Sequence, residues 1–480
     1  MWWGISHARL VNFKGMKLAS ERLALKYRDS VRNNSAYVNS SNGITIVNNS
    51  RQIFETYESE ARSYCRSIPV VFSRAQGATL TDETGKTYLD FISGAGALNY
   101  GHNCPSIKQG LIEYLEQDGV IMALDMHSVE KAKFIQAFQS LILQPRNLDY
   151  KLQFTSPTGT SVVESAVKLA KKYTKRDGIV AFTNGYHGMT GISLALTGNS
   201  YHRQAYSQGN VFRLPFDGYI GDNVDTMAYF RQLLDDKSSG LDLPAAVIVE
   251  TIQGEGGLNT ASISWLKELR NITREYGIVL IVDEVQTGCG RTGNFFSFER
   301  ASIKPDLVCL SKSIGGMGLP FALLLVTPDM DLWKPGEDNG TFRGNNLAFV
   351  ASRLAIEQYW TNDTFQRQIT EKSKIISNAL NHITREFPLL VKGVKGLGLM
   401  QGLEFFNAKH ARSVVEACFE AGLIIETCGS EGEVLKLMCP LNIDDKVLNK
   451  GLAIIRESIV SSLARGEKKS TSTQETLSFV

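Results

Sequence analysis

Several features that mark specialised protein classes are absent from this sequence or scarce in it. The 480 residues carry a formal net charge of only +2, so the charge does not suggest a nucleic-acid-binding surface. No run of apolar residues is long enough to span a bilayer. The seven histidines do not show the metal-ligand spacing H-E-x-x-H. We therefore expect neither nucleic acid nor a membrane as a partner.

Cysteine is also scarce. The sequence has seven cysteines, an odd number, and they are scattered without close pairs. This pattern argues against both a disulfide framework and a zinc site. The expected location is therefore cytoplasmic, and no metal site is expected. The cysteines are Cys65, Cys104, Cys289, Cys309, Cys418, Cys428 and Cys439.

The two ends of the chain differ from the rest. Residues 1–51 are basic and then rich in Asn and Ser. They indicate an N-terminal extension, which is either a mobile segment or the result of a start codon placed too early. A transit peptide is the alternative, because the segment is poor in acidic residues. Residues 465–480 form a polar tail that is expected to be disordered.

Strand and helix patterns alternate through the middle of the chain. Apolar residues form one broad stripe over 161–174, which predicts a helix. Short apolar strands are predicted at 178–183 and 245–250, and a helix at 262–276 leads into a strand at 278–286. This rhythm predicts an α/β fold with a mostly parallel sheet and right-handed crossovers. Ligands of such sheets lie beyond the carboxyl ends of the strands.

The C-terminal third has a different pattern. Helices are predicted at 349–359, 364–387 and 408–424, and a glycine-punctuated strand pair at 393–405. Together with N-terminal strands around 77–90, these elements indicate a small α+β domain. The predicted domains are therefore a large domain at 105–348 and a small domain built from two segments, 52–104 and 349–464.

Lys312 and Asp283 are the strongest candidates for catalysis. Lys312 follows the apolar strand that begins at Asp306 and precedes a glycine-rich loop, and Asp283 lies near the end of a similar strand. This pair suits pyridoxal phosphate, since a lysine forms a Schiff base with its aldehyde and an acid keeps its pyridine nitrogen protonated. A lone lysine is usually a solvated surface charge. That interpretation is weaker here, because a buried lysine loses proton affinity.

The same predicted sheet offers a binding site for the phosphate. Thr158, Gly159 and Thr160 stand at the start of a helix, where free N–H groups favour an anion. The alternative is that these residues form only an N-cap.

Other loop residues could contact the ring of the same cofactor. Tyr186 could stack on it with His187 nearby, or pack only against loop glycines. Gln286 could donate to a phenolic oxygen, or be an ordinary loop amide.

Taken together, the motifs resemble those of the class III (ω-) aminotransferases. Asp283–Gly293 (DEVQTGCGRTG) is similar to the signature of that family, and Val249–Gly257 (VETIQGEGG) and PTGT match two further elements. The resemblance covers roughly residues 54–465. It implies fold type I, pyridoxal 5'-phosphate as cofactor, and Lys312 as the catalytic lysine. Gly340–Asn346 (GTFRGNN) matches an element whose threonine reaches the phosphate of the neighbouring subunit. Thr341 therefore implies a homodimer, or a higher homo-oligomer, with shared active sites.

Further segments resemble one subfamily, the diaminobutyrate:2-oxoglutarate aminotransferases of ectoine biosynthesis. They are Glu58–Phe72, Ser93–Asn103 and Leu124–Ser128. This resemblance implies ping-pong transfer of an amino group from L-glutamate to L-aspartate 4-semialdehyde, which gives L-2,4-diaminobutyrate and 2-oxoglutarate. Siderophore and peptide natural-product pathways use the same reaction, so the pathway stays open.

The sequence departs from the family at the residue that binds the substrate carboxylate. Many members have an arginine there, and Lys436 takes its place. Lysine holds a carboxylate as a point charge, without the bidentate fork of arginine. The resemblance also suggests Glu255 as a switch that pairs with this cation, and the alternative is a solvated loop acid.

Other functions use the same residues. Ornithine or 4-aminobutyrate transamination is the nearest alternative, and an isomerase would keep the same lysine and acid. A non-catalytic interaction subunit is a further alternative, which the presence of Lys312 and Asp283 argues against. A nucleotide-binding protein is weakly supported, because the sequence has no G-x-x-x-x-G-K-[ST] motif.

Overall fold

The structure is a computed structural model that describes residues 50–204, 206, 209–221 and 223–477, with side chains up to residue 464. The predictions for residues 1–49 lie outside the described residues. Contacts divide the chain into two units, Met1–Val71 and Phe72–Val480. The described part of the first unit contains two short helices, α2 (Ser50–Tyr57) and α3 (Tyr64–Ser67). Within the described residues, no helix has the length and apolar character needed to cross a membrane.

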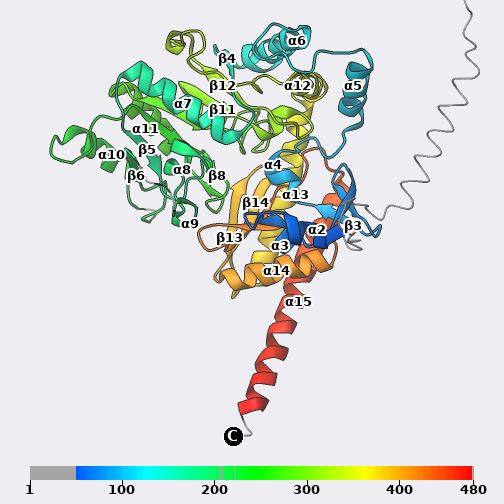
Figure 1. The fold of residues 1–480 in the computed structure, drawn as a ribbon. Helices are drawn as coiled ribbons and strands as arrows, with labels where there is room; N and C mark the ends of the chain where they lie inside the picture. Colours follow the sequence, from blue (N-terminus) through cyan, green and yellow to red (C-terminus); the bar gives the residue numbers. More distant parts are fainter. Residues whose placement is uncertain (1–49, 205, 207–208, 222, 478–480) are drawn as a thin grey trace, which may run out of the picture. The chain divides into compact units, whose positions relative to one another are not determined.

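A seven-stranded sheet forms the centre of the large domain (Figure 1). Its order is β4-β12-β11-β10-β7-β5-β6, and only β12 runs antiparallel to its neighbours. The mostly parallel sheet predicted from the alternating pattern is therefore confirmed. The strands are β4 (Lys151–Phe154), β5 (Ile179–Phe182), β6 (Val211–Leu214), β7 (Ala246–Val249), β10 (Val279–Asp283), β11 (Leu307–Leu310) and β12 (Leu323–Val326).

Helices cover both faces of this sheet, which explains why its strands are apolar throughout. Successive strand residues point to opposite faces. Ile179 and Ala181 of β5 pack in one cluster with α7 (Gly159–Thr174), whereas Val180 and Phe182 pack in another cluster with residues of α11 (Ile263–Glu275) and α12 (Asn346–Tyr359). Asn345 caps α12 by accepting from two backbone amides.

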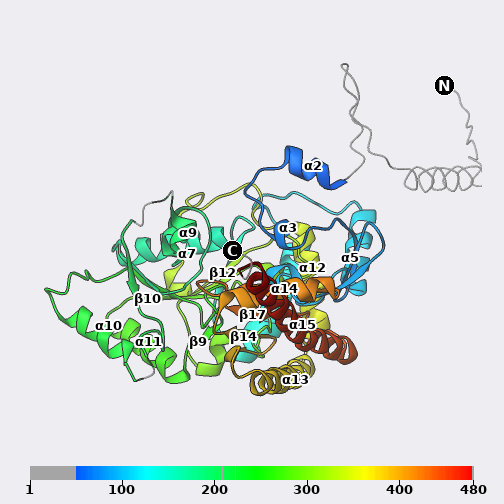
Figure 2. The ribbon, with the colours of Figure 1, turned by 90° about the horizontal axis from the view of Figure 1, so that it is seen from below.

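The small domain contains two further sheets. One has the order β13-β14-β17-β16, with β13 (Val391–Leu397), β14 (Met400–Phe405), β17 (Val434–Leu437) and β16 (Glu426–Cys428). The other has the order β1-β2-β3-β15, with β1 (Phe72–Gln76), β2 (Thr79–Asp82), β3 (Thr87–Asp90) and β15 (Leu423–Ile424). Helices α13 (Thr364–Glu386), α14 (Ala408–Glu420) and α15 (Asp445–Leu477) lie around β14 and β17 (Figure 2).

The pairing of β15 with β3 joins the two segments of the small domain. Leu423 pairs with Leu89 and Ile424 with Asp90. The helix predicted at 408–424 is therefore too long, since it ends at Glu420. Gly422 has a φ of +85°, which ends the helix, and the apolar residues after it form the strand.

The polar tail also differs from its prediction. Helix α15 continues through residue 477, although residues 465–480 are polar and were expected to be disordered. Extending a helix that is already nucleated adds one hydrogen bond for each residue ordered. Beyond residue 464 the described part of α15 contains no proline and a single glycine, so composition alone does not stop it.

Candidate active site

Lys312 stands at the carboxyl end of β11. Its φ of +54° lies in the left-handed region, which costs of order 1–3 kcal/mol for a residue other than glycine. The two flanking serines hold this backbone, because Ser311 Oγ donates to Phe321 O at 2.9 Å and Ser313 Oγ donates to Gly96 O at 2.7 Å. In the described part of the chain, the Lys312 amine makes no hydrogen bond, so it is available to a bound molecule.

The charge of Lys312 is set by its surroundings. Burial lowers the pKa of this amine, the nearby Glu255 carboxylate opposes that change, and Lys436 lowers the pKa further. The net direction is downward, toward the neutral amine. A neutral amine is the form that attacks a carbonyl carbon and that accepts a proton.

Asp283 is the last residue of β10, the strand next to β11. His187 Nδ1 donates to Asp283 Oδ2 at 2.8 Å, and Val285 N donates to Asp283 Oδ1 at 3.0 Å. Burial alone would lower the pKa of His187, but the hydrogen bond to Asp283 and its charge more than offset burial, so this pKa is raised. Asp283 is thus a buried carboxylate with a fixed orientation.

Glu250 follows the neighbouring strand β7 and is buried. It accepts backbone N–H groups of Tyr186 at 2.9 Å and Gly254 at 3.1 Å, so it links two loops of the site. Burial raises its pKa to about 7. Tyr186 is half-buried and lies edge-on to His202, with ring centroids 6.0 Å apart. The structure therefore places Tyr186 and His187 beside Asp283 and Glu250.

Lys436, on β17, has a fully buried side chain between two carboxylates. Its Nζ lies 2.8 Å from Glu255 Oε1 and 3.0 Å from Glu426 Oε1. Burial alone would lower the pKa of Lys436, but the two carboxylates raise it well above its usual value. For Glu255, burial raises the pKa, but Lys436 and Lys312 reverse this, so the net direction is downward. Both groups of the Lys436–Glu255 pair are therefore held in their charged forms.

Gln286 joins this cluster to the short helix α4 (Ser93–Gly96), which follows β3. Its Nε2 donates to Glu255 Oε1 and to Ala95 O, both at 3.1 Å. Its buried Oε1 has no partner within the described residues. The Gln286 amide thus donates within the protein, to Ala95 and Glu255, whereas the sequence predicted a donor toward a phenolic oxygen. That donor role stays a prediction.

The predicted phosphate site forms the amino end of α7. Thr158 is the N-cap, and its side chain accepts from Ser161 N at 3.2 Å. The first amides of the helix, at Gly159 and Thr160, have no acceptor inside the helix. A Cβ on Gly159 would approach Val285 Cγ1 to 2.9 Å, so only glycine allows the start of this helix to pack against the loop after Asp283.

Thr341 lies apart from Lys312 in sequence and is exposed. Its loop packs against the segment before α7, because a Cβ on Gly340 would come within 2.7 Å of Ser156 Oγ. The Thr341 side chain makes no hydrogen bond within the described part of the chain. It is therefore available to a group outside this chain.

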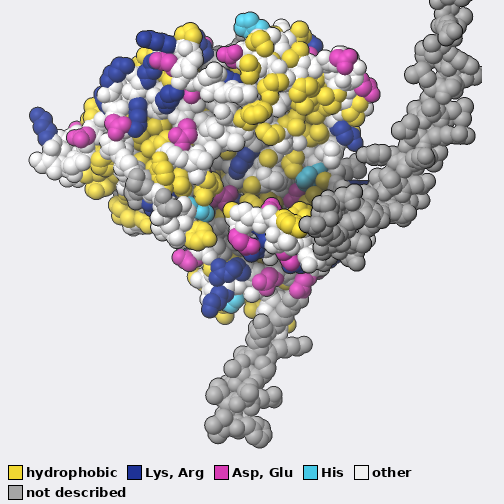
Figure 3. Space-filling model, viewed as in Figure 1, with side chains coloured by type: hydrophobic (Ala, Val, Ile, Leu, Met, Phe, Trp, Pro, Cys, Tyr) yellow, Lys and Arg dark blue, Asp and Glu magenta, His cyan; other side chains and the backbone are white. Residues whose placement is uncertain are grey.

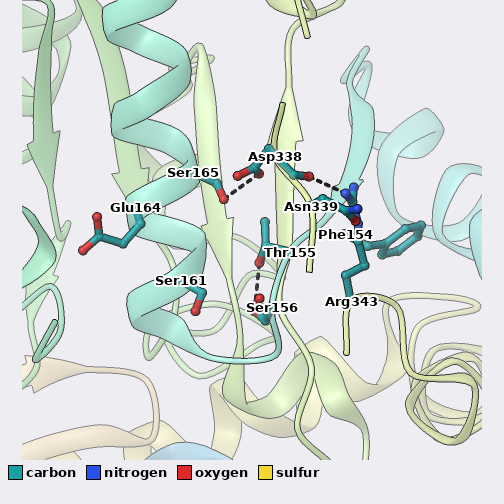
Figure 4. Close-up of a pocket in the computed structure, with 9 residues that line it drawn as sticks. All are labelled: Phe154, Thr155, Ser156, Ser161, Glu164, Ser165, Asp338, Asn339 and Arg343. Atoms are coloured by element: carbon teal, nitrogen blue, oxygen red, sulfur yellow. Dashed lines mark hydrogen bonds between the residues drawn. The ribbon is translucent and has the colours of Figure 1, made fainter. Parts of the chain in front are cut away.

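A separate polar pocket of about 200 Å³ lies between this loop and α7 (Figure 4). Ser165 Oγ donates to Asp338 at 2.8 Å, and Arg343 donates to the backbone of Asp338. Because Lys312 and Asp283 do not line it, we assign the chemistry to the strand ends and not to this pocket. Its lining residues are Phe154, Thr155, Ser156, Ser161, Glu164, Ser165, Asp338, Asn339 and Arg343.

These observations fit pyridoxal phosphate as the bound group. A lysine amine without a hydrogen-bond partner among the described residues, a buried carboxylate and a helix amino end meet at the carboxyl edge of the sheet. Gly254 lets its loop pack closely against Gln286, since a Cβ there would lie 1.8 Å from Gln286 Oε1. Lys312 would bond to the cofactor aldehyde, Asp283 would face the ring nitrogen, and the start of α7 would hold the phosphate.

One residue of this cluster, Glu426, was not predicted from the sequence. Glu426 pairs directly across the sheet with Lys436, and its own element was predicted neither as a strand nor as part of the site. The available signal was the short alternating segment after Gly422. It becomes informative only when its register with β17 is known.

Comparisons with known proteins identify the family of this chain. The model of the class-III aminotransferase family matches residues 61–459. A diaminobutyrate–2-oxoglutarate transaminase of Vibrio parahaemolyticus is 51% identical over 421 residues, which cover 87% of this chain and 100% of that protein. A protein of the same name from Vibrio cholerae is 54% identical over 410 residues, covering 85% of this chain and 99% of the relative.

A solved structure shares the fold at much lower identity. The S-selective transaminase of an Arthrobacter species has a TM-score of 0.77 at 21% identity, covering 87% of this chain and 98% of the other. This likeness concerns the fold alone and agrees with the predicted fold type I. The family match and the two close relatives show that this chain belongs to the class-III aminotransferases, which are transaminases that depend on pyridoxal phosphate.

Proposed function

We propose that this protein transfers an amino group between L-glutamate and L-aspartate 4-semialdehyde, giving L-2,4-diaminobutyrate and 2-oxoglutarate. The relatives at 51% and 54% identity carry the name of that reaction. The structural observation that carries the proposal is the ion pair of buried Lys436 with partly exposed Glu255, beside the Lys312 amine. This pair suits a site that must accept two unlike amino donors.

The two donors differ at the carbon that reacts. Glutamate reacts at its α-carbon, which carries a carboxylate, whereas diaminobutyrate reacts at a terminal carbon that carries none. Lys436 would bind the glutamate α-carboxylate after Glu255 turns away. With diaminobutyrate, Glu255 would stay on Lys436 and keep the buried ammonium paired, because an unpaired buried charge is costly.

The residues at the strand ends divide the chemistry. When bound, pyridoxal phosphate supplies an electron sink for the carbon that loses its proton. The Lys312 amine would take this proton from the donor in the first half-reaction. It would return a proton to the acceptor carbon in the second. Asp283, oriented by His187, would keep the ring nitrogen protonated. The first half-reaction would release 2-oxoglutarate before the semialdehyde enters, which is ping-pong kinetics.

We also propose that the enzyme is a homodimer, or a higher homo-oligomer, with shared active sites. Apolar side chains gather on the face over α5 (Pro105–Glu116), α6 (Val129–Ala137) and α12 (Figure 3). The segment between α5 and α6 contributes large exposed residues, a pattern typical of an association surface. Exposed Phe342 stands next to Thr341, which would reach the partner's phosphate. The exposed residues are Val120, Ile121, Met122, Leu124 and Met126, each 45–60% exposed, with Phe342 at 63%.

The cytoplasm stays the proposed location. All seven cysteines are free thiols, as expected in a reducing compartment. Ectoine synthesis is the proposed pathway, and siderophore or peptide natural-product synthesis is the alternative. Transamination of ornithine or 4-aminobutyrate is the alternative for the reaction itself.

The test uses purified protein loaded with pyridoxal phosphate. L-2,4-diaminobutyrate, L-ornithine and 4-aminobutyrate are added singly, and the absorbance of the lysine-bound cofactor is followed as it converts to the amine form. 2-Oxoglutarate is then added to restore it. Conversion by diaminobutyrate, reversed by 2-oxoglutarate, supports the proposal. Faster conversion by ornithine or 4-aminobutyrate overturns the substrate assignment.

A further inference from the structure

Glu426 has no part in the proposed reaction, yet it lies inside the charged cluster. It stands directly opposite Lys436 in the antiparallel pair of β16 and β17, which places both side chains on one face of the sheet. Its Oε1 lies 3.0 Å from Lys436 Nζ. That oxygen is buried and accepts no aligned hydrogen bond within the described residues. Glu426 therefore acts on its neighbours mainly through its charge.

One ammonium does not balance the carboxylates around it. Glu255 and Glu426 both lie within ion-pair distance of Lys436, so the three groups together are negative. Glu255 alone would already neutralise Lys436, so Glu426 supplies the excess. Its charge also reaches the catalytic amine, since Glu426 opposes the lowering of the Lys312 pKa.

Resting on the proposed function, we infer that Glu426 is a specificity-determining residue that favours amino donors carrying an additional ammonium group. Diaminobutyrate and 4-aminobutyrate both react at a terminal carbon without a carboxylate, so both leave Glu255 on Lys436. They differ in the α-ammonium, which only diaminobutyrate has. A negative cluster attracts that extra positive charge, and it repels molecules with two carboxylates. The Glu255 switch cannot make this distinction, because its state is the same for both donors.

The test replaces Glu426 and compares these two donors. Glu426→Gln keeps the size of the side chain and removes its charge, and Lys436 keeps Glu255 as its counter-charge. The rate constants kcat/KM of the half-reactions are measured with diaminobutyrate and with 4-aminobutyrate. We expect the ratio of these values to fall about tenfold, which corresponds to about 1.4 kcal/mol. Glu426→Asp, which draws the charge back by one methylene, should lower the ratio by a smaller amount.

Binding gives a second readout that does not depend on turnover. Glutarate has two carboxylates and no amine to react, and its dissociation constant is measured by calorimetry on the loaded enzyme. We expect Glu426→Gln to tighten glutarate binding severalfold. Glu404→Gln is the matched control, because Glu404 lies on β14 of the same sheet and pairs with exposed Lys392 at 3.0 Å. It should change neither quantity.

Each outcome is decisive for Glu426. If Glu426→Gln lowers thermal stability but leaves both the donor ratio and the glutarate affinity unchanged, Glu426 only balances Lys436 and the inference is wrong. If Glu426→Gln does not fold, the ratio in Glu426→Asp decides. A wild-type enzyme that prefers 4-aminobutyrate would overturn the proposed function instead, and glutarate binding would still test the charge of Glu426.

Discussion

The Glu255–Lys436 pair leads to a prediction that separates the two half-reactions. Glu255→Gln removes the charge that competes with a substrate carboxylate for Lys436 and leaves Glu426 in place. We expect glutamate and 2-oxoglutarate to bind more tightly, because their carboxylate no longer displaces an anion. We expect diaminobutyrate to react less efficiently, because the Lys436 ammonium then faces a donor with no carboxylate at its reacting carbon.

The size of the effect follows from the geometry. Lys436 Nζ donates to Glu255 Oε1 at 2.8 Å, and a hydrogen bond between charged groups contributes about 1.5–3 kcal/mol. The Glu255 side chain is 31% exposed, so solvent screening reduces this contribution, to about 1–2 kcal/mol. An energy of about 1.4 kcal/mol is tenfold in an equilibrium constant. Each change is therefore about five- to thirtyfold. Because the two changes have opposite signs, the ratio of kcat/KM for glutamate to that for diaminobutyrate should rise by about 30- to 900-fold.

The assay is stopped-flow absorbance of the loaded enzyme, with each donor alone. Glu404→Gln again serves as the control, since it removes a carboxylate of the same sheet that lies outside the Lys436 cluster. Equal losses for both donors in Glu255→Gln would refute the reasoning, because Glu255 would then support the site without distinguishing its substrates.

Four further predictions concern other parts of the molecule. Lys312→Ala should abolish the absorbance of the lysine-bound cofactor and lower kcat by at least about 10⁴-fold, while circular dichroism stays unchanged; residual turnover near the wild-type value would contradict its role. Asp283→Asn should lower kcat by about 10²-fold or more, and NMR should show a lower pKa for His187, which loses the charge that raises it. For the proposed homodimer, Met122→Glu should shift sedimentation from dimer toward monomer, and a dimer unchanged by this substitution would place the interface elsewhere. Burial raises the pKa of Glu250 from 4.5 to about 7. Its contribution to stability is therefore fully present below pH 4.5 and is lost as pH rises through 7. Glu250→Gln should flatten the decrease in the free energy of unfolding between pH 4.5 and 7.

Local sequence patterns predicted the strands and helices of the large domain because the apolar positions of these elements are the positions that become buried. Strand β7 is covered on both faces and is therefore apolar at every position, and α7 buries one broad stripe. The boundaries shifted by a few residues, as at Gly159, where the cap at Thr158 starts the helix two residues before the expected Ser161. Strand β15 was assigned to a helix because its two residues have no period of their own. Its pairing with β3 depends on a contact more than three hundred residues away in sequence.

The candidate site also has a part that was predictable from the sequence and a part that was not. Lys312, Asp283 and Thr158 follow strand ends or start a helix, so topology alone brings them to one edge of the sheet. The loop partners of these residues were not predictable, since no local pattern specifies that His187 donates to Asp283 or that Glu250 joins two loops. Gln286 shows the limit most clearly. Its position was predicted, but the direction of its amide depends on Ala95, which lies 191 residues earlier.

The neighbours of position 436 explain why a lysine stands there, where many family members have an arginine. A guanidinium presents a planar fork that suits one carboxylate held bidentately. Position 436 instead faces two carboxylates, from the loop after β8 (Ile252–Gln253) and from the opposite strand, at 2.8 and 3.0 Å. A compact ammonium with three donors can face both and keep the cross-strand partner when the loop carboxylate leaves. In the proposed function, the lysine would bind a substrate carboxylate, the loop glutamate would compete for the lysine, and the strand glutamate would set the net charge of the cluster.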